Sequence, residues 1–303
     1  MWAQLVESGI FDGVIDIPES DWIFDYKELE DETPSRLKNI AFQDEILKRM
    51  KGVLFIFNSC KQLRLSRSIA LTAATLLHRF YMLEDLKTYH YYEVSATSIF
   101  VACKAEECRR NLKDVVKICC RIATGKNESI DEDDKLYWRW KDIIVRLEQL
   151  MLQRLNFDVT PINPYKITLN ALMIEAEPSV IISPNKQWES QARAIFQHCT
   201  YIFELFSRLP LCLLFSTQCI CALTILLSAK KSGCTFPPNY IGDKLEVSVN
   251  DIISCHQIFI RMAMFTNVLE KHYRILHLLP PASSEELGKL YEGTEDSSLY
   301  KQE

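Results

Sequence analysis

The segment YEVSATSIFVACKAEE, residues 92–107, decides the fold class of this 303-residue chain. Its apolar side chains alternate with alanine, serine and cysteine, and charged residues stand only near its two ends. A helix with such narrow side chains lets neighbouring helices approach closely, because interaxial distance depends on the side chains at the contact. We therefore predict that this segment is the central helix of a helical bundle.

Working outward, apolar residues recur at spacings of three and four, the pattern of amphipathic helices. Ser66 precedes one such stretch and is the predicted N-cap of that helix. Only 8 residues are glycine, which leaves little material for tight β turns and favours an all-α fold. Helices are predicted near residues 44–60, 67–80, 92–107, 112–123, 136–155, 165–176, 188–209, 216–230 and 249–275.

The segments between these helices suggest how the chain is divided. Residues 1–40 are expected to be irregular, residues 127–134 to be an acidic loop, and residues 234–250 to be rich in loops. From Pro280 onward the chain is polar, acidic and rich in serine, which is typical of a disordered tail. A short repeat at an offset of 126 residues aligns Ala96–Lys104 with Ala222–Lys230 and suggests two bundles built on one plan.

Composition restricts the possible functions. The formal net charge of −5 argues against non-specific nucleic-acid binding, which needs a strongly basic surface, although a local basic patch is left open. The 11 cysteines form no paired metal-binding frame and are interpreted as small buried hydrophobes in a reducing compartment. No N-terminal targeting segment is recognised. Residues 209–229 lack charge and are interpreted as two buried helices joined by a bend at Pro210, with a membrane span as the alternative.

One acid and one base stand out against this apolar background. Glu148 has Ile144, Met151 and Leu152 as helical neighbours, and Lys104 ends an otherwise apolar run. A carboxylate in an apolar stripe is costly to bury unless it is paired, so the two residues invite a Lys104–Glu148 ion pair. The alternative is that both are edge residues whose long side chains reach water. No nucleophile constellation, phosphate loop, metal motif or kinase signature was found, so no catalytic, cofactor or metal residues are predicted.

Several motifs together resemble the cyclin family, and within it cyclins T and K and the fungal cyclin subunits of RNA polymerase II C-terminal-domain kinases. The resemblance covers roughly residues 22–276. Its pieces are Trp22-Ile23-Phe24, Thr33-Pro34-Ser35-Arg36, His78-Arg79-Phe80-Tyr81-Met82, Val101-Ala102-Cys103-Lys104-Ala105-Glu106-Glu107, Leu147-Glu148-Gln149-Leu150, Leu155-Asn156-Phe157-Asp158 and Asn163-Pro164-Tyr165.

The resemblance implies an all-α chain with two cyclin boxes, each a five-helix bundle. The implied division is an N-terminal extension at 1–40, a first box at 41–160, a second box at 161–278 and a disordered tail at 279–303. It also implies a kinase-binding surface formed by Lys104, Glu148, Glu107, Leu152, Phe157 and Phe100. Two departures from cell-cycle cyclins are Ala105, where those proteins often have phenylalanine, and the near absence of an apolar substrate-docking patch around Lys48, Lys51, Gly52 and Phe55.

The function implied by the resemblance is regulatory and not enzymatic. The chain is expected to bind and activate a cyclin-dependent kinase that phosphorylates the RNA polymerase II C-terminal domain and promotes transcription elongation. A third subunit is left open, and no cofactor, direct nucleic-acid contact or membrane is expected. The implied location is the nucleus. The alternatives are a cyclin of a splicing-linked or mediator-linked kinase, or a cyclin-like general transcription factor that binds DNA.

Overall fold

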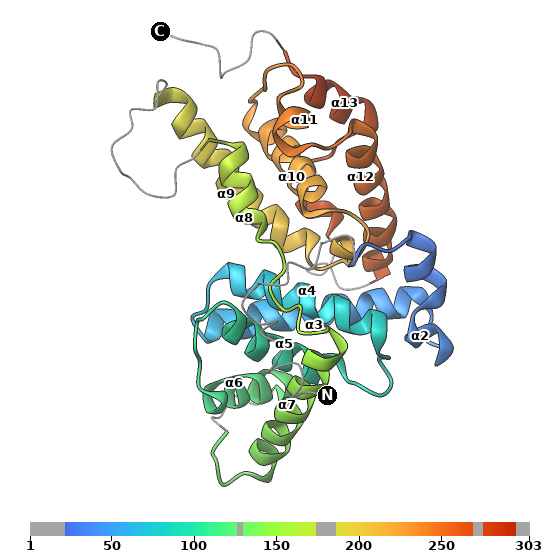
Figure 1. The fold of residues 1–303 in the computed structure, drawn as a ribbon, viewed down its shortest axis with the longest axis vertical. Coiled ribbons are helices and arrows are strands. Elements are labelled where there is room, and N and C mark those ends of the chain that lie inside the picture. Colours follow the sequence, from blue (N-terminus) through green and yellow to red (C-terminus); the bar gives the residue numbers. More distant parts are fainter. Residues whose placement is uncertain (1–21, 126–129, 174–185, 269–274, 295–303) are drawn as a thin grey trace, which may run out of the picture.

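The structure is a computed structural model that describes residues 22–125, 130–173, 186–268 and 275–294. Over these residues the chain is helical and contains no strand, so the predicted all-α class is confirmed. Figure 1 shows two groups of helices stacked along the long axis, with α3–α7 in one group and α8–α13 in the other. The blue N-terminal segment lies beside their junction.

The first group is built around α5 (Tyr91–Ala105). Every residue from Val94 to Cys103 is buried, and α5 packs against α3, α4, α6 and α7. The small side chains of α5 explain this central place, as the sequence predicted. The surrounding helices are α3 (Phe42–Gln62), α4 (Arg67–Leu83), α6 (Leu112–Thr124) and α7 (Lys135–Arg154).

The starts and ends of these helices follow local rules. The predicted cap at Ser66 is confirmed, because its hydroxyl accepts a hydrogen bond from the Ile69 amide at 3.3 Å. Asp134 caps α7 in the same way through the Leu136 amide at 2.8 Å. Gly125 ends α6 with φ +65°, a left-handed conformation that costs glycine little.

The second group repeats the plan around α10 (Thr217–Ser232), in which Cys221 to Ala229 are all buried. The short repeat detected in the sequence therefore falls on the central helices of the two groups, α5 and α10. The other elements are α8 (Pro164–Ala171), α9 (Lys186–Phe206), η4 (Leu211–Leu213), α11 (Tyr240–Leu245), α12 (Val249–Met264), η5 (Phe265–Val268), η7 (Leu276–Leu278) and α13 (Ser284–Glu292).

Residues 22–40 are more ordered than the sequence predicted, while residues 1–21 lie outside the described residues. Within the extension expected to be irregular, η3 (Glu28–Glu32) is a π-helical turn and α2 (Pro34–Leu37) a short helix. Leu29 is fully buried in the core that contains the second group, whereas Trp22 and Ile40 belong to the core of the first. The segment thus contacts both cores. Its buried apolar residues account for its order, although the sequence shows no strong helical periodicity there.

The expected disordered tail is wrong for residues 284–292, which form α13. A capping box starts this helix, because Ser283 and Glu286 each accept a backbone hydrogen bond from the other, and Leu287 is fully buried. Residues 295–303 lie outside the described residues. Two predicted helices are also shorter than expected, since α8 ends at Ala171 and α12 at Met264, while 234–250 contains the unpredicted helix α11.

The uncharged stretch 209–229 breaks at Pro210, as predicted. It continues as η4 and then α10, and no helix in the described part of the chain has the length and hydropathy of a membrane span. Nine of the 11 cysteines are buried and none forms a disulfide. Burial raises the pKa of the Cys119 and Cys199 thiols to about 12, which suits inert core residues.

Candidate functional site

Lys104 and Glu148 form the ion pair that the sequence predicted. The Lys104 Nζ lies 2.6 Å from Glu148 Oε1, and it also lies 4.3 Å from the centre of the Phe100 ring. The Lys104 side chain is 55% exposed and that of Glu148 only 16%. The lysine therefore lies at the surface while the carboxylate is half withdrawn from water, so a partner that covers the pair would desolvate both charges.

Two packed helices hold this pair in place. Lys104 stands in the last turn of α5, and Glu148 lies near the C-terminal end of α7, which packs directly on α5. Leu147 and Met151 are buried and fix the rotation of α7, so that Glu148 points to the edge of the helix–helix contact. The cation at the C-terminal end of α5 also opposes the negative end of the helix dipole.

Apolar side chains continue the surface beside the pair. Phe100 is 7% exposed, Leu152 is half-buried and Phe157 is 56% exposed. Phe157 has a left-handed backbone with φ 62°, and its amide donates to the Leu152 carbonyl at 2.9 Å. This turn after α7 presents a large aromatic side chain outward on a fixed backbone.

Asp158 anchors the turn that carries Phe157. Its Oδ2 accepts hydrogen bonds from Trp22 Nε1 at 2.6 Å and from Arg79 Nη1 at 2.8 Å, and the Arg79 guanidinium stacks 4.8 Å from the Trp22 ring. The sequence singled out these residues only as pieces of a family resemblance. Their contact joins positions 136 residues apart, so no local pattern could have revealed it.

The two acids that follow α5 differ in their surroundings. Glu106 caps α5 and accepts hydrogen bonds from Ser68, at 3.1 Å, and from Thr72, so its unfavourable position at the helix end is offset inside the chain. Glu107 is exposed and has a left-handed backbone with φ 53°. Glu107 lies just after the end of α5 that carries Lys104. Its role in kinase binding stays a prediction.

The second group of helices carries a comparable pair in which the lysine is the more buried member, 27% exposed against 52% for its carboxylate partner. Lys230, the repeat counterpart of Lys104, lies 2.9 Å from Glu286 of α13 and also donates to the Pro281 carbonyl. Here the partner carboxylate comes from a helix that packs over α10. The Lys104 side chain is 55% exposed against 27% for Lys230, so the lysine of the first pair is the more accessible of the two.

Two further observations concern metal-binding groups and the expected docking patch. Among the described residues, no group of three His, Cys, Asp or Glu side chains is placed to hold a metal ion. Phe55, at the expected position of a docking patch, is 4% exposed and packs 4.8 Å from the Tyr92 ring. That burial supports the prediction that this chain does not dock short basic-apolar motifs there.

Comparisons with known proteins identify the fold and the family. The cyclin N-terminal domain family matches residues 22–160. Cyclin pch1 of Schizosaccharomyces pombe (strain 972 / ATCC 24843) is 36% identical over 239 residues, which cover 77% of this chain and 66% of that protein. Cyclin-T1-5 of Arabidopsis thaliana is 28% identical over 229 residues, covering 75% of this chain and 37% of that protein.

A chain in the crystal structure of the yeast RNA Pol II CTD kinase CTDK-1 complex superposes with a TM-score of 0.62 over 90% of this chain and 91% of that one. The two are 13% identical, so this likeness concerns the fold alone. Two successive helical bundles, each around a buried central helix, define a cyclin-type fold. The chain belongs to the cyclin family, and its relatives are of the transcription type. It spans 66% of the fission-yeast cyclin and under two fifths of the two plant cyclins.

Proposed function

We propose that this chain is the regulatory, non-catalytic subunit of a cyclin-dependent kinase that phosphorylates the RNA polymerase II C-terminal domain and promotes transcription elongation in the nucleus. The similarity to cyclin pch1 and to the plant T-type cyclins supports this assignment. The kinase-binding surface consists of Lys104, Glu148, Glu107, Leu152, Phe157 and Phe100.

The observation that carries the proposal is the Lys104–Glu148 pair, whose lysine lies at the surface, beside the exposed side chain of Phe157. An amino group and a carboxylate at 2.6 Å offer a donor and an acceptor to the ends of a partner helix. Phe157 and Leu152 offer apolar area next to these polar groups. Large aromatic and charged residues that become desolvated together are typical of the energetic centre of an interface.

Activation follows from binding one conformation of the kinase. A rigid helical surface that fits only the active placement of the kinase's regulatory helix shifts the kinase population toward that placement. The active state requires the kinase's own Lys–Glu ion pair, whose formation depends on the position of that helix. The cyclin therefore contributes binding energy and no chemical group.

Substitution of the pair tests the surface. Glu148→Ala leaves Lys104 without its carboxylate, and Lys104→Ala leaves Glu148 uncompensated when the partner covers it. Each change is expected to weaken kinase binding by about 2–5 kcal/mol, while circular dichroism and urea unfolding stay close to wild type. Affinity is measured by calorimetry once the kinase has been identified by co-purification.

The Lys230–Glu286 pair of the second group supplies the matched control. Lys230→Ala removes a lysine at the equivalent helix end, where α13 already supplies the partner carboxylate. Its kinase affinity is expected to match that of the wild-type chain. Equal losses in Lys104→Ala and Lys230→Ala, or unchanged affinity in both Lys104→Ala and Glu148→Ala, would withdraw these residues from the site.

The substrate is tested on the co-purified complex with an RNA polymerase II heptad-repeat peptide. Heptad phosphorylation that is lost with Glu148→Ala supports the whole proposal. A kinase that acts only on other substrates keeps the cyclin role and removes the transcription assignment. A chain that captures no kinase but shifts duplex DNA in a salt-dependent manner would instead be a cyclin-like transcription factor.

A further inference from the structure

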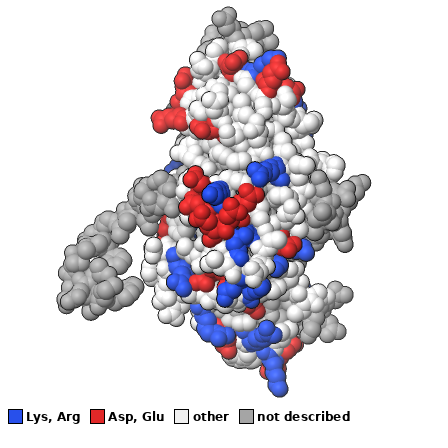
Figure 2. Space-filling view, turned by 90° about the vertical axis from the view of Figure 1, so that its right-hand side faces the viewer, with Lys and Arg blue, Asp and Glu red and all other residues white. Residues whose placement is uncertain are grey.

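Charge is distributed unevenly over this acidic protein. Figure 2 shows a dense group of acidic side chains on the face that carries η3, with basic side chains more scattered over the first group of helices. The η3 sequence ELEDE supplies four carboxylates, three of them in the first turn. A second concentration of charge, of the opposite sign, lies where α3 ends, α4 begins and α5 turns into α6.

Six cations form this basic surface. They come from three segments that are separate in sequence: the end of α3 with the turn before α4, the loop after α5, and α6. Arg64 is exposed and has a left-handed backbone with φ 53°. The six residues are Lys61, Arg64, Arg67, Arg109, Arg110 and Arg121.

Hydrogen bonds bring the three segments together. The Arg110 guanidinium donates to the Arg64 carbonyl at 3.4 Å and to the Arg109 carbonyl at 3.2 Å. Arg121 of α6 donates to the Gln62 side chain at the end of α3. Arg67 donates to Thr200 of α9 at 3.3 Å, so the basic surface extends to the second group. Neutral acceptors hold these guanidinium groups in place without cancelling their charge.

No carboxylate among the described residues neutralises the six cations. Within the described residues none of them lies within ion-pair distance of an acid, whereas the neighbouring Lys113 and Lys117 both pair with Glu132. Glu106 is engaged by Ser68 and Thr72, and Glu107 is the exposed acid of the same loop. Arginines held in place but left without an acid are suited to a phosphate, which they bind bidentately.

The residues between the cations discriminate between ligand classes. Segments 58–68 and 104–124 contain no phenylalanine, tyrosine or tryptophan, and Tyr165, which lies near Arg67, packs edge-on against Phe196 and Phe203. Surfaces for single-stranded nucleic acid normally combine cations with aromatic side chains on which bases stack. The basic surface therefore fits a phosphorylated peptide better than RNA.

We propose that the basic surface binds the phosphorylated heptads of the RNA polymerase II C-terminal domain, and so retains a partly phosphorylated substrate for further rounds. The identity of the peptide rests on the proposed function, whereas phosphate recognition rests on the cations themselves. A phosphoserine adds a charge of about −1.5 to −2, so each phosphorylated heptad strengthens the attraction.

Fluorescence anisotropy of the chain without kinase tests the binding step. The probe is a three-heptad peptide with one phosphoserine per repeat, and the same peptide without phosphate is the reference. We expect at least tenfold tighter binding of the phosphopeptide at low salt, with an affinity that falls as salt is raised. The double variant Arg64→Glu/Arg110→Glu is expected to lose at least tenfold in affinity, and Arg64→Gln/Arg110→Gln to lose less.

A matched variant, Lys87→Glu/Lys231→Glu, makes the same change in net charge at two exposed lysines that are not among the six cations. It is expected to bind within about twofold of wild type. Equal affinity for both peptides, equal losses in both charge-reversal variants, or tighter binding of RNA or duplex DNA than of the phosphopeptide would overturn the proposal.

Kinase co-purification separates this inference from the proposed function. Arg64→Glu/Arg110→Glu is expected to retain the kinase and its rate on an unphosphorylated single heptad, but to lose the preference for pre-phosphorylated repeats. Loss of the kinase itself would show that these arginines belong to the kinase interface, and the substrate-retention role would be wrong. Phosphopeptide binding without any co-purifying kinase would support phosphate recognition by the basic surface and would contradict only the kinase assignment.

Discussion

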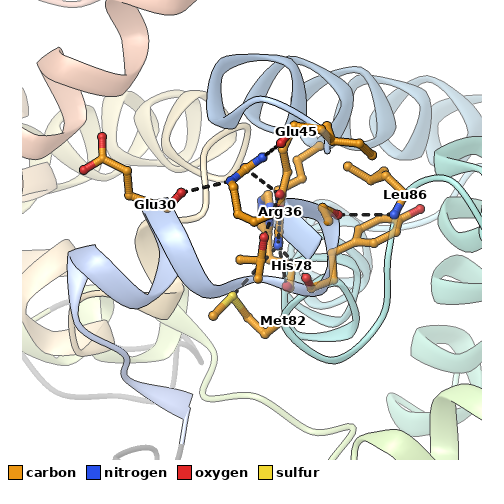
Figure 3. Close-up of polar contacts among 11 residues, drawn as sticks. Glu30, Arg36, Glu45, His78, Met82 and Leu86 are labelled. Atoms are coloured by element: carbon orange, nitrogen blue, oxygen red, sulfur yellow. Dashed lines mark hydrogen bonds and ion pairs between the residues drawn. The ribbon is translucent and has the colours of Figure 1, made fainter. Parts of the chain in front are cut away.

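Arg49 and Glu45 form a charged network inside the first group of helices, shown in Figure 3. Arg49 is completely buried and donates to Glu45 Oε1 at 2.7 and 2.8 Å, to the His78 carbonyl at 2.7 Å and to the Tyr81 carbonyl at 2.9 Å. Glu45 Oε2 accepts from Thr33 and from Arg36 at 2.9 and 2.7 Å. The network joins the N-terminal segment to α3 and α4. Helical periodicity alone cannot predict it, because it assigns no burial to charged residues.

The cost of breaking this network is the first prediction at the residue scale. Arg49→Met removes the cation and takes a donor away from two buried carbonyls and from one oxygen of a buried carboxylate. Removing one partner of a buried ion pair costs about 3–5 kcal/mol. Urea unfolding should show that loss. Lys289→Met breaks an exposed pair of equal length, 2.7 Å, with Glu285, and should cost less than about 1 kcal/mol. Similar losses in the two variants would contradict the argument.

His78 gives the second residue-scale prediction. Burial, together with the nearby Arg49 charge, lowers the pKa of His78 from 6.5 to about 3, although its Nε2 lies 2.9 Å from the Ser207 carbonyl. In the unfolded chain this imidazole takes up a proton near pH 6.5, while the folded chain keeps it neutral. Stability from this residue is therefore complete above pH 6.5 and is lost as the pH falls toward 3.

Between pH 7 and pH 5 the expected loss from His78 is about 2 kcal/mol. The check is the difference in urea unfolding free energy between wild type and His78→Gln at each pH, which cancels carboxylates that titrate alike in both chains. The wild type should lose more stability than the variant as the pH falls. Parallel curves would show that His78 becomes charged without penalty.

At the scale of the element, α5 and α13 mark the limits of prediction from sequence. The length and apolar faces of α3 to α7 follow from periodicity, and the predicted positions hold within a few residues. The sequence of α13 is mostly polar, so it gives no sign of the one buried side chain, Leu287. The burial of Leu287 depends on the surfaces of α10 and α12, which only the fold brings together. The Lys104–Glu148 pair could be suspected because each residue interrupts an apolar helix, but the residues alone equally allowed two edge side chains that reach water, and the family resemblance decided for the pair. The arginines of the basic surface do not interrupt an apolar pattern, so no local signal marks them. Only folding brings their three segments together.

Two adjacent residues of α13 test its contribution. Leu287→Ala removes a completely buried side chain and should destabilise the protein by about 2–5 kcal/mol. Gly288 lies in the same helix with no atom within 4 Å of an added Cβ, so Gly288→Ala should stabilise by about 0.5–1 kcal/mol through better helix propensity. Thermal or urea unfolding should give opposite signs. A negligible effect of Leu287→Ala would mean that α13 is detached in solution.

At the scale of the whole molecule, residues 22–40 link the two groups of helices. The Phe24 amide donates to the Leu213 carbonyl at 2.7 Å, Glu30 pairs with Arg261 of α12 at 3.3 Å, and Trp22 reaches Asp158 of the first group. Leu29, Ile46 and Met50 also join the core of the second group. The resemblance implies a division of the chain at residue 160. This division stays a prediction, because residues of α3 in the first group belong to the core of the second.

This shared packing predicts that the chain unfolds as one cooperative unit. In the full chain, urea transitions followed by tryptophan fluorescence and by circular dichroism should coincide, since neither group retains its packing without the other. Deleting residues 1–40 removes the link and exposes apolar surface on both groups. We expect the two transitions to separate, because two of the three remaining tryptophans, Trp138 and Trp140, lie in the first group while helicity reports on both. Leu37→Ala, at a side chain that is 82% exposed in the same segment, should leave the transitions coincident. Coincident transitions after the deletion would show that the direct contact of α3 and α4 with the second group is sufficient for cooperativity.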